Sequence, residues 1–202
     1  MKNLHRSLSM TTLILVVAAI LSASAAAFAP SHHQLPSSRW RAYRSYDGIC
    51  SELYGMKINI RIVGRKSGSE KWLDDAYAMY DKRLRPSSLE VETTWHKDNE
   101  ALEKGVEGDK NKGHSVVLLD PLGKTRTSEK LSEDIYNWLD QGGSRLSFVI
   151  GGAEGLPEEM KQQNRNHLSL SSLTFTHQFA RVLLMEQIYR SSEIKKGSGY
   201  HK

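Results

Sequence analysis

The chain has 202 residues, of which 28 are Lys or Arg and 23 are Asp or Glu, so its formal net charge is +5. Residues 1–55 hold five of the basic and two of the acidic residues, so the net charge of the remaining residues is only +2. A net charge this small gives little support to nucleic-acid binding. The single cysteine, Cys50, precedes the part that is expected to fold, which excludes a disulfide-stapled domain and a thiolate metal site there.

Residues 1–27 have the organisation of a secretory signal peptide. The basic residues Lys2 and Arg6 precede an apolar run over 13–21, and small residues follow up to a cleavage site expected at 25–27. A membrane-spanning helix needs roughly 20 apolar residues, so this shorter run favours a cleaved signal over an anchor.

Residues 28–55 have the composition of an organellar transit peptide. They are rich in serine and arginine, and no acidic residue occurs in the chain before Asp47. A signal peptide joined to such a segment resembles the bipartite plastid-targeting leaders of algae with secondary plastids, such as diatoms. The plastid (chloroplast) is therefore the predicted location, with a secreted protein or another organelle as the alternative.

Residues 56–202 are expected to form one domain, because they are numerous enough to bury a substantial core. Alternating isoleucines predict a strand that starts at Met56 and ends at Gly64. Apolar residues at helical spacing predict a helix over 72–86, which a proline closes. Alternation then returns and predicts a second strand over 89–95.

The middle of this domain continues with a helix, a strand and another helix. The segment 98–112 is highly charged and contains glycines, so a short helix followed by a loop is predicted. The apolar run 116–119 predicts a strand buried on both faces, with a turn over 120–124 at its carboxyl end. Ser128 is the predicted cap of the next helix, which glycines end at Gly142.

The last part begins with another buried strand, over 146–150. Pro157 suits the first position of a short helix, and an apolar, hydroxyl-rich stretch covers 168–175. The final helix is expected to stop near Gly197. Strands that alternate with helices predict an α/β fold whose mainly parallel sheet is flanked by helices.

The loop 151–155 has glycine at three of its five positions and follows a buried strand. Glycine allows the backbone to turn sharply and allows a ligand to approach the main chain. Loops beyond the carboxyl ends of parallel strands are where open α/β sheets bind nucleotide-like ligands. A tight connection without a ligand gives the same pattern. The loop matches neither the P-loop nor the dinucleotide-binding fingerprint.

Six segments together carry a resemblance to a known family: Met56-Lys57-Ile58, Leu119-Asp120, Ile150 to Gly155, Leu168 to Gln178, Arg181 to Arg190, and the closing Tyr200-His201-Lys202. Over 56–202 the chain closely resembles the ribosomal RNA large subunit methyltransferase H family of the SPOUT superfamily. The resemblance implies a carboxyl-terminal trefoil knot, which is rare among folds, and a homodimer. It also implies transfer of a methyl group from S-adenosyl-L-methionine to N3 of a pseudouridine in helix 69 of large-subunit rRNA, in the assembled ribosome.

By the same resemblance, three segments contact the methyl donor. Their residues are Leu119, Gly151, and the stretch Leu170, Ser171, Ser172, Leu173, Thr174 and Phe175. Backbone groups in these segments suit the polar edges of the donor, and the leucines suit its apolar surfaces. For Leu173 and Phe175, an ordinary place in the core is the alternative.

The candidates for proton chemistry are His177, Arg181, Tyr200 and His201. The imide N3 of a uracil-type base is a weak acid, so a nearby base or cation would assist loss of its proton. The tail that carries the last two candidates is expected to complete the site across a dimer. Arg181 can instead pair with Glu186 or bind phosphate. The family usually has a proline where this chain has Thr176, a change that could loosen the loop.

A surface for RNA phosphates is predicted from eight basic residues: Lys57, Arg61, Arg65, Lys66, Arg190, Lys195, Lys196 and Lys202. An ordinary solvated face is the alternative for these positions. The predicted function is that of a plastid rRNA methyltransferase with no metal. Two alternatives remain: a catalytically inactive ribosome- or RNA-binding factor with the same fold, and a related enzyme that acts on tRNA.

Overall fold

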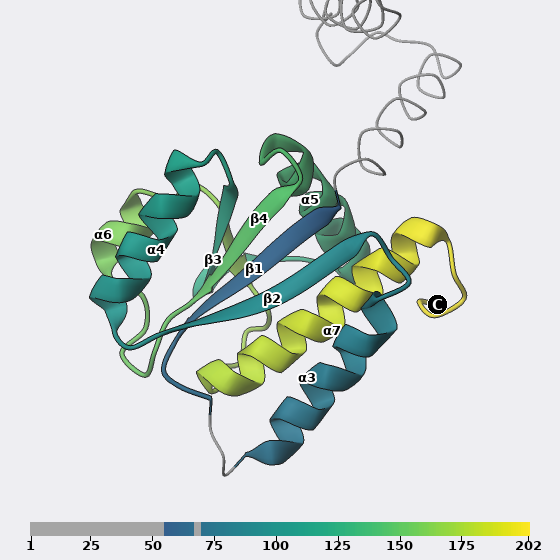
Figure 1. The fold of residues 1–202 in the computed structure, drawn as a ribbon, viewed down its shortest axis with the longest axis horizontal. Coiled ribbons are helices and arrows are strands. Elements are labelled where there is room, and N and C mark those ends of the chain that lie inside the picture. The colour runs from purple at the N-terminus through teal and green to yellow at the C-terminus, as the bar shows by residue number, and fades with distance from the viewer. Residues whose placement is uncertain (1–54, 67–69) are drawn as a thin grey trace, which may run out of the picture. The chain divides into compact units, whose positions relative to one another are not determined.

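The computed structural model describes residues 55–66 and 70–202, so the predicted signal and transit segments lie outside the described residues. The elements are, in chain order, β1 (Met56–Val63), α3 (Lys71–Leu84), β2 (Leu89–His96), α4 (Asn99–Asn111), β3 (Ser115–Thr125), α5 (Ser128–Gln141), β4 (Arg145–Ile150), α6 (Glu158–Gln162), β5 (His167–Ser169) and α7 (His177–Lys196) (Figure 1). None of the helices in this described part is both long enough and apolar enough to cross a membrane.

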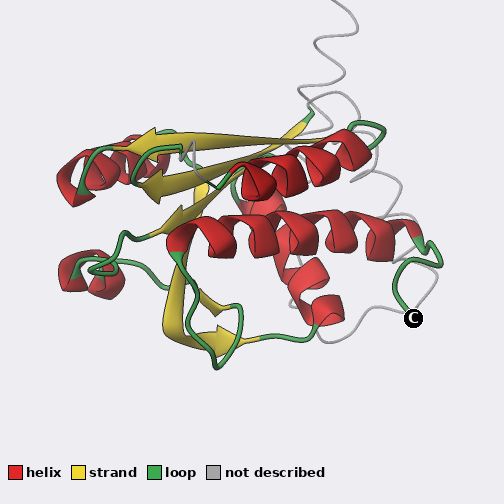
Figure 2. Ribbon diagram, turned by 90° about the horizontal axis from the view of Figure 1, so that it is seen from below, coloured by secondary structure: helices red, strands yellow, loops and turns green. Residues whose placement is uncertain are grey.

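The five strands form one sheet in the order β2-β1-β4-β3-β5, and every pair is parallel. Helices α3, α5 and α7 cover one face of the sheet, where α7 contacts both α3 and α5, while α4 and α6 pack on the other face (Figures 1 and 2). The predicted α/β fold with a parallel sheet between helices is confirmed. The trefoil knot stays a prediction.

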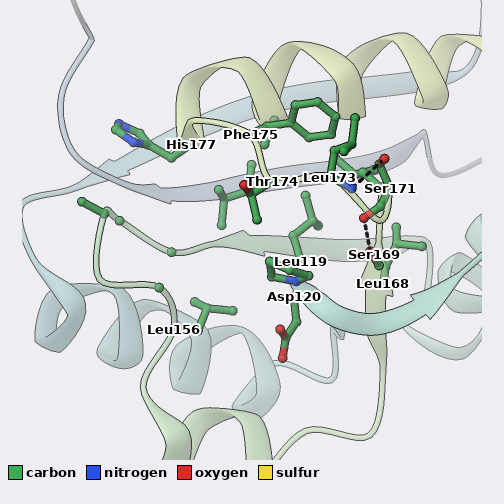
Figure 3. Close-up of a pocket in the computed structure, with 18 of the residues that line it drawn as sticks. Leu119, Asp120, Leu156, Leu168, Ser169, Ser171, Leu173, Thr174, Phe175 and His177 are labelled. Carbon is green, nitrogen blue, oxygen red and sulfur yellow. Dashed lines mark hydrogen bonds between the residues drawn. The ribbon is translucent and has the colours of Figure 1, made fainter.

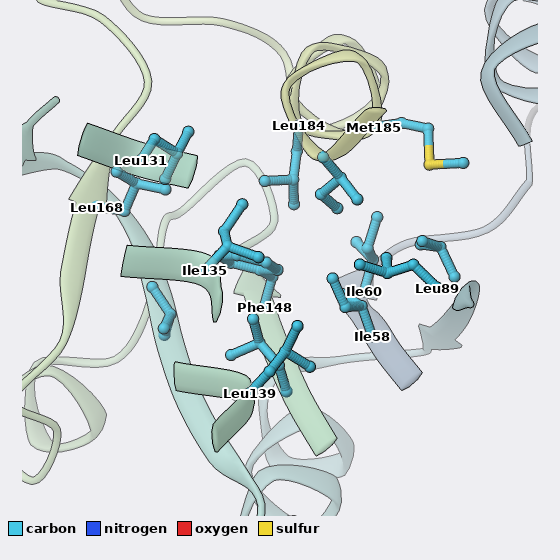
Figure 4. Close-up of a cluster of buried hydrophobic side chains, with 14 of the residues drawn as sticks. Ile58, Ile60, Leu89, Leu131, Ile135, Leu139, Phe148, Leu168, Leu184 and Met185 are labelled. Carbon is cyan, nitrogen blue, oxygen red and sulfur yellow. The ribbon is translucent and has the colours of Figure 1, made fainter. Parts of the chain in front are cut away.

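Each face of the sheet has its own apolar core. Ile58 and Ile60 of β1 are fully buried and, with Phe148 of β4, meet Ile135 of α5 and Leu184 of α7 (Figure 4). On the opposite face, a smaller cluster joins α4 and α6 to the sheet; it contains Leu102, Val106, Val116, Leu118, Val149, Leu156 and Met160. Strands β3 and β4 read as continuous apolar runs because both of their faces are covered.

Helix α4 differs from the prediction, because it is continuous over 13 residues rather than a short helix followed by a loop. Asp98 caps it, with a side chain that accepts a hydrogen bond from the Ala101 amide at 2.8 Å. The misleading glycine is Gly105. A Cβ there would lie 2.7 Å from Nη1 of Arg61 and 2.7 Å from Cε1 of His96. This glycine therefore marks a close approach of the helix to the sheet.

Strand β3 also differs, because it continues through the predicted turn to Thr125. Leu119 and Lys124 both pair with Leu168 of β5, so the residues between them bulge out of the ladder. Oδ1 of Asp120 accepts a hydrogen bond from the backbone amide two residues later at 3.0 Å, which shapes the bulge. Strand β3 thus bends as it leaves β4 and follows β5.

The N-terminal caps of α5 and α7 bear on two positions that the sequence singled out, Ser128 and Thr176. The side chain of Thr127 caps α5 by accepting from the Lys130 amide, while Ser128 donates instead to Gln187 of α7 at 3.1 Å. The predicted cap was therefore wrong by one residue. Thr176 caps α7 through its hydroxyl oxygen, so this residue, where the resemblance led us to expect proline, has a structural role of its own.

Candidate functional site

A pocket of about 280 Å³ opens at the carboxyl ends of β3 and β4, where three loops meet (Figure 3). Its volume lies close to the lower end of the range for small-molecule sites, roughly 300–1,000 Å³. Seven of the eight residues that were predicted to contact the methyl donor line it: Leu119, Gly151, Leu170, Ser171, Leu173, Thr174 and Phe175. Ser172 does not belong to the lining. Segments about fifty residues apart in sequence thus share one cavity.

The glycine loop closes tightly on itself beside this pocket. A Cβ on Gly151 would lie 2.5 Å from the carbonyl carbon of Gly155, a distance that real Cβ atoms do not reach. Gly155 has a φ of 78°, and its amide donates to the carbonyl of Gly152 at 3.0 Å. The glycines are therefore needed for the sharp turn of the backbone, which is one of the two roles that the sequence indicated, the other being the close approach of a ligand.

The loop between β5 and α7 is shaped by its own hydroxyl groups. Ser169 donates to the carbonyl of Ser171 at 2.7 Å, and the amide of Leu173 donates to Oγ of Ser171 at 3.1 Å. The side chain of Leu173 is exposed, with 69% of its surface accessible, and Phe175 is 37% exposed. Neither is a core residue, so the alternative interpretation of these two positions is wrong.

His177 begins α7 and lines the pocket on the side opposite Asp120 (Figure 3). Its ring packs against Gly64 at the end of β1, where a Cβ would lie 3.2 Å from Nε2. Gly64 also has a φ of 123°, so only glycine suits both the backbone and the neighbouring ring. Of the four predicted catalytic residues, His177 alone is part of the pocket lining.

Arg181 lies one turn further along α7 and outside the pocket lining. Its guanidinium is 2.7 Å from Oδ1 of Asp74 and stacks over the rings of Tyr77, at 4.6 Å, and Trp95, at 5.0 Å. The residue is only 3% exposed. Burial raises the pKa of Tyr77, whose hydroxyl accepts a hydrogen bond from Thr93. Arg181 therefore ties α7 to α3 and β2, and its partner is Asp74 rather than Glu186.

Tyr200 and His201 follow the carboxyl end of α7, near which Figure 2 shows the chain terminus. Tyr200 donates to Oε1 of Glu186 at 3.2 Å, and Nε2 of His201 is 2.7 Å from Oε1 of Glu129. The hydrogen bond from His201 lowers the pKa of Glu129 to about 2. The tail thus folds back along the second half of α7, and Glu186, which Tyr200 contacts, is nine residues or about 14 Å of helix rise from His177.

The predicted basic surface is largely ion-paired. Arg61 does not belong to it, because its guanidinium makes two hydrogen bonds of 2.6 and 2.7 Å to the buried carboxylate of Asp109. Four of the others have acidic neighbours: Lys57 with Glu90, Lys66 with Asp74, Arg190 with Glu186, and Lys196 with Glu193. Pairing of this kind reduces the positive field that phosphates would meet.

Two charged residues of the pocket were missed as site residues. Asp120 is 6% exposed, and Oδ2 of its carboxylate lies 3.4 Å from Nδ1 of His167 and 3.9 Å from Nζ of Lys161. Asp120 and Lys161 both line the pocket. Asp120 directly follows a buried strand, which was a usable signal in the sequence. Lys161 comes from α6, and its position depends entirely on how that helix packs.

The fold and the pocket define a class of protein. The family model described as Predicted SPOUT methyltransferase matches residues 56–201, so the chain belongs to the SPOUT methyltransferases. Solved structures with a related arrangement include the TrmH/SpoU tRNA modifying enzyme of A. aeolicus, at 7% identity and a TM-score of 0.40, with 76% of this chain and 85% of that chain covered. Another is the SpoU methyltransferase AviRb of Streptomyces viridochromogenes in complex with AdoMet, at 12% identity and a TM-score of 0.39, with 68% and 58% covered.

Curated relatives show which family within this class the chain belongs to. The chain is 47% identical over 147 residues to ribosomal RNA large subunit methyltransferase H of Protochlamydia amoebophila, which covers 73% of this chain and 99% of the relative. It is 37% identical over 165 residues to the protein of the same name from Halothermothrix orenii, with 73% and 100% covered. Within the SPOUT class, the chain belongs to the ribosomal RNA large subunit methyltransferase H family. The first relative is covered almost completely by 147 aligned residues, so it is about as long as residues 56–202 of this chain.

Proposed function

We propose that this chain is an S-adenosyl-L-methionine-dependent methyltransferase that acts on large-subunit rRNA. The observation that carries the proposal is the convergence of Leu119, Gly151 and the 170–175 loop on one pocket, in a chain that is 47% identical to a curated methyltransferase of this family. The segments that the sequence resemblance singles out come from three separate parts of the chain and meet at this one cavity.

The residues of the pocket fit such a cofactor. Leucine side chains and Phe175 offer apolar walls to an adenosine group, and the backbone of the 170–175 loop, which lines the pocket, suits its polar edges. The bound cofactor supplies a methyl group already activated on sulfur. The protein therefore has to bind and orient donor and acceptor, exclude water, and assist loss of a proton from the acceptor nitrogen.

The proposed acceptor is N3 of a pseudouridine in helix 69, in the large subunit of a plastid ribosome. His177 supports this chemistry, because it is the imidazole at the pocket and an imidazole can take up the N3 proton. The plastid location rests on the composition of residues 1–55. A fusion of these residues to a fluorescent protein should enter plastids of an alga with secondary plastids, and secretion of the fusion would contradict the location.

We further propose a homodimer in which the tail of one protomer completes the pocket of its partner. Support comes from the contacts of the tail within its own chain, where Tyr200 reaches Glu186 and His201 reaches Glu129. Glu186 is about 14 Å of helix rise from His177, too far for the tail and His177 to contact one base together within one chain. Mixing two inactive variants tests this arrangement. His177→Asn keeps the tail but damages the pocket, and a chain that ends at Ser198 keeps the pocket but loses the tail.

If the site is shared, the mixed sample regains about a quarter of the wild-type activity, because about half of the dimers are mixed and each has one intact site. Activity that stays at the level of the separate variants would contradict the shared site. A tail-truncated chain that is fully active by itself would do the same.

The function itself is tested with the chain from Met56 onward and bacterial 70S ribosomes that lack the modification. Nucleoside mass spectrometry is expected to find N3-methylated pseudouridine in helix 69 after addition of S-adenosyl-L-methionine. Cofactor binding without any methylation of the ribosome would favour the inactive binding factor. Methylation of tRNA in place of ribosomal RNA would favour the related tRNA enzyme.

A further inference from the structure

The charges of the pocket are concentrated on one side. Its lining contains one carboxylate, Asp120, one ammonium group, Lys161, and the imidazole of His177 on the opposite side (Figure 3). The rest of the lining consists of apolar, glycine and hydroxyl residues. A charged ligand group that is buried without a partner costs free energy. The charged groups of a ligand would therefore lie beside Asp120 and Lys161.

The carboxylate of Asp120 is held in place but not saturated. Its Oδ1 accepts from the Leu122 amide at 3.0 Å, and its Oδ2 faces Nδ1 of His167 at 3.4 Å. The other ring nitrogen of His167 lies 3.0 Å from the carbonyls of Lys161 and Asn164, which fixes the ring behind the carboxylate. An ionised carboxylate can accept about four hydrogen bonds, so Asp120 can accept more than it does.

The ammonium group of Lys161 is likewise available. Its Nζ lies 3.9 Å from Oδ2 of Asp120, too far for a hydrogen bond, and 3.3 Å from Oε2 of Glu158. Glu158 is an exposed residue outside the pocket lining, with 72% of its side chain accessible. Lys161 has three donors and only 26% of its side chain exposed, so it presents unsatisfied donors beside the carboxylate.

We infer that Asp120 and Lys161 form the subsite for the amino-acid end of the methyl donor. Asp120 accepts hydrogen bonds from the α-ammonium group, and Lys161 donates to the α-carboxylate. The neighbouring negative and positive side chains are complementary to the neighbouring ammonium and carboxylate groups of an amino acid. This inference rests on the proposed function, because it takes the ligand to be an adenosyl amino acid. It assigns roles to two residues outside the three segments that carried the resemblance.

Two ligands isolate the amino-acid end from everything else. S-adenosyl-L-homocysteine and 5′-methylthioadenosine share the adenosine and an uncharged sulfur, but only the former has the α-ammonium and α-carboxylate groups. Calorimetric titration of the chain from Met56 onward should give at least about 100-fold tighter binding of S-adenosyl-L-homocysteine, as expected for two charge-assisted contacts.

Lys161→Met and Asp120→Asn should each reduce this preference by about tenfold or more, while the affinity for 5′-methylthioadenosine stays unchanged. Lys161 is partly exposed, so its variant keeps the test valid if Asp120→Asn disturbs the bulge of β3. Glu158→Gln is the matched control. It removes a charge that contacts Lys161 from outside the pocket, and the preference should remain.

An undiminished preference in Lys161→Met would overturn the inference and leave the proposed function intact, because the cofactor would still be bound. Equal affinity of the wild type for both ligands would do the same. If the wild type bound neither S-adenosyl-L-methionine nor S-adenosyl-L-homocysteine, the proposed function would fail together with the inference. The wild-type titrations alone therefore show whether the proposed function fails, and the Lys161→Met titration decides the inference separately.

Discussion

The buried ion pair between Arg61 and Asp109 holds α4 against the sheet, and Asp109→Asn should destabilise the fold strongly. The carboxylate accepts two hydrogen bonds from Arg61 and a third from Ser147, and its side chain is 3% exposed. Burial raises the pKa of Asp109, but the hydrogen bonds from Arg61 and Ser147 outweigh this effect and keep the pKa below its ordinary value.

Removing one partner of a buried pair costs roughly 3–5 kcal/mol, because the other charge is left alone. Arg61 retains 13% side-chain exposure, so the lower end of that range, about 3 kcal/mol, is expected for Asp109→Asn. The carboxylate has a lowered pKa in the folded state. Its contribution is therefore complete above the unfolded pKa of about 3.9 and is lost as the pH falls through the folded pKa.

Urea denaturation at neutral pH measures this free energy of unfolding. Glu100→Gln on the same helix is the matched control, because Glu100 and its partner Lys104 are 75% and 74% exposed. Its expected cost is below about 1 kcal/mol. Arg61→Met combined with Asp109→Leu should recover part of the loss, since neither charge remains unpaired. A loss from Asp109→Asn no larger than that of the control would refute the reasoning.

Three further predictions concern the loop, the sheet and α7. Gly151→Ala should weaken cofactor binding at least about tenfold in calorimetry, because the added methyl group prevents closure of the loop. The control is Gly108→Ala, whose Cβ would have no neighbour within 4 Å and should slightly stabilise α4. Equal cofactor affinity of the two variants would contradict the role of the loop. Burial and the charge of Arg61 lower the pKa of His96, so the free energy of unfolding should fall as the pH drops below about 6.5, and His96→Gln should flatten this dependence in urea titrations. Thr176→Ala should cost about 1 kcal/mol by removing the cap of α7, and an unchanged unfolding midpoint would count against it.

Periodicity in the sequence located the strands well. Strand β1 was expected from Met56 to Gly64 and runs over Met56–Val63, because its alternation reflects one face packed on the larger core. Strands β3 and β4 were recognised by continuous apolar runs, which follow from burial on both faces. The pocket residues Leu119 and Gly151 were also identified, through the resemblance rather than through periodicity.

The errors came from signals whose meaning depends on distant neighbours. Gly105 reads as a helix breaker in the sequence, but it lies within α4 because Arg61 and His96 occupy the space of its missing side chain. The segment after Leu119 reads as a turn, but its strand continues because β5, more than forty residues later, pairs with it. Neither neighbour is visible from local sequence.

The sequence by itself determined the fold class, the family and the segments that line the pocket, because these depend on local periodicity and on motifs. The tertiary structure decided which candidates can act together. It buried Arg181 against Asp74, and it brought Asp120 and Lys161 to one side of the pocket. Charge pairing and packing across α3, α6 and α7 decide these positions. Such contacts join residues that are distant in the chain, so they produce no periodic pattern in the sequence.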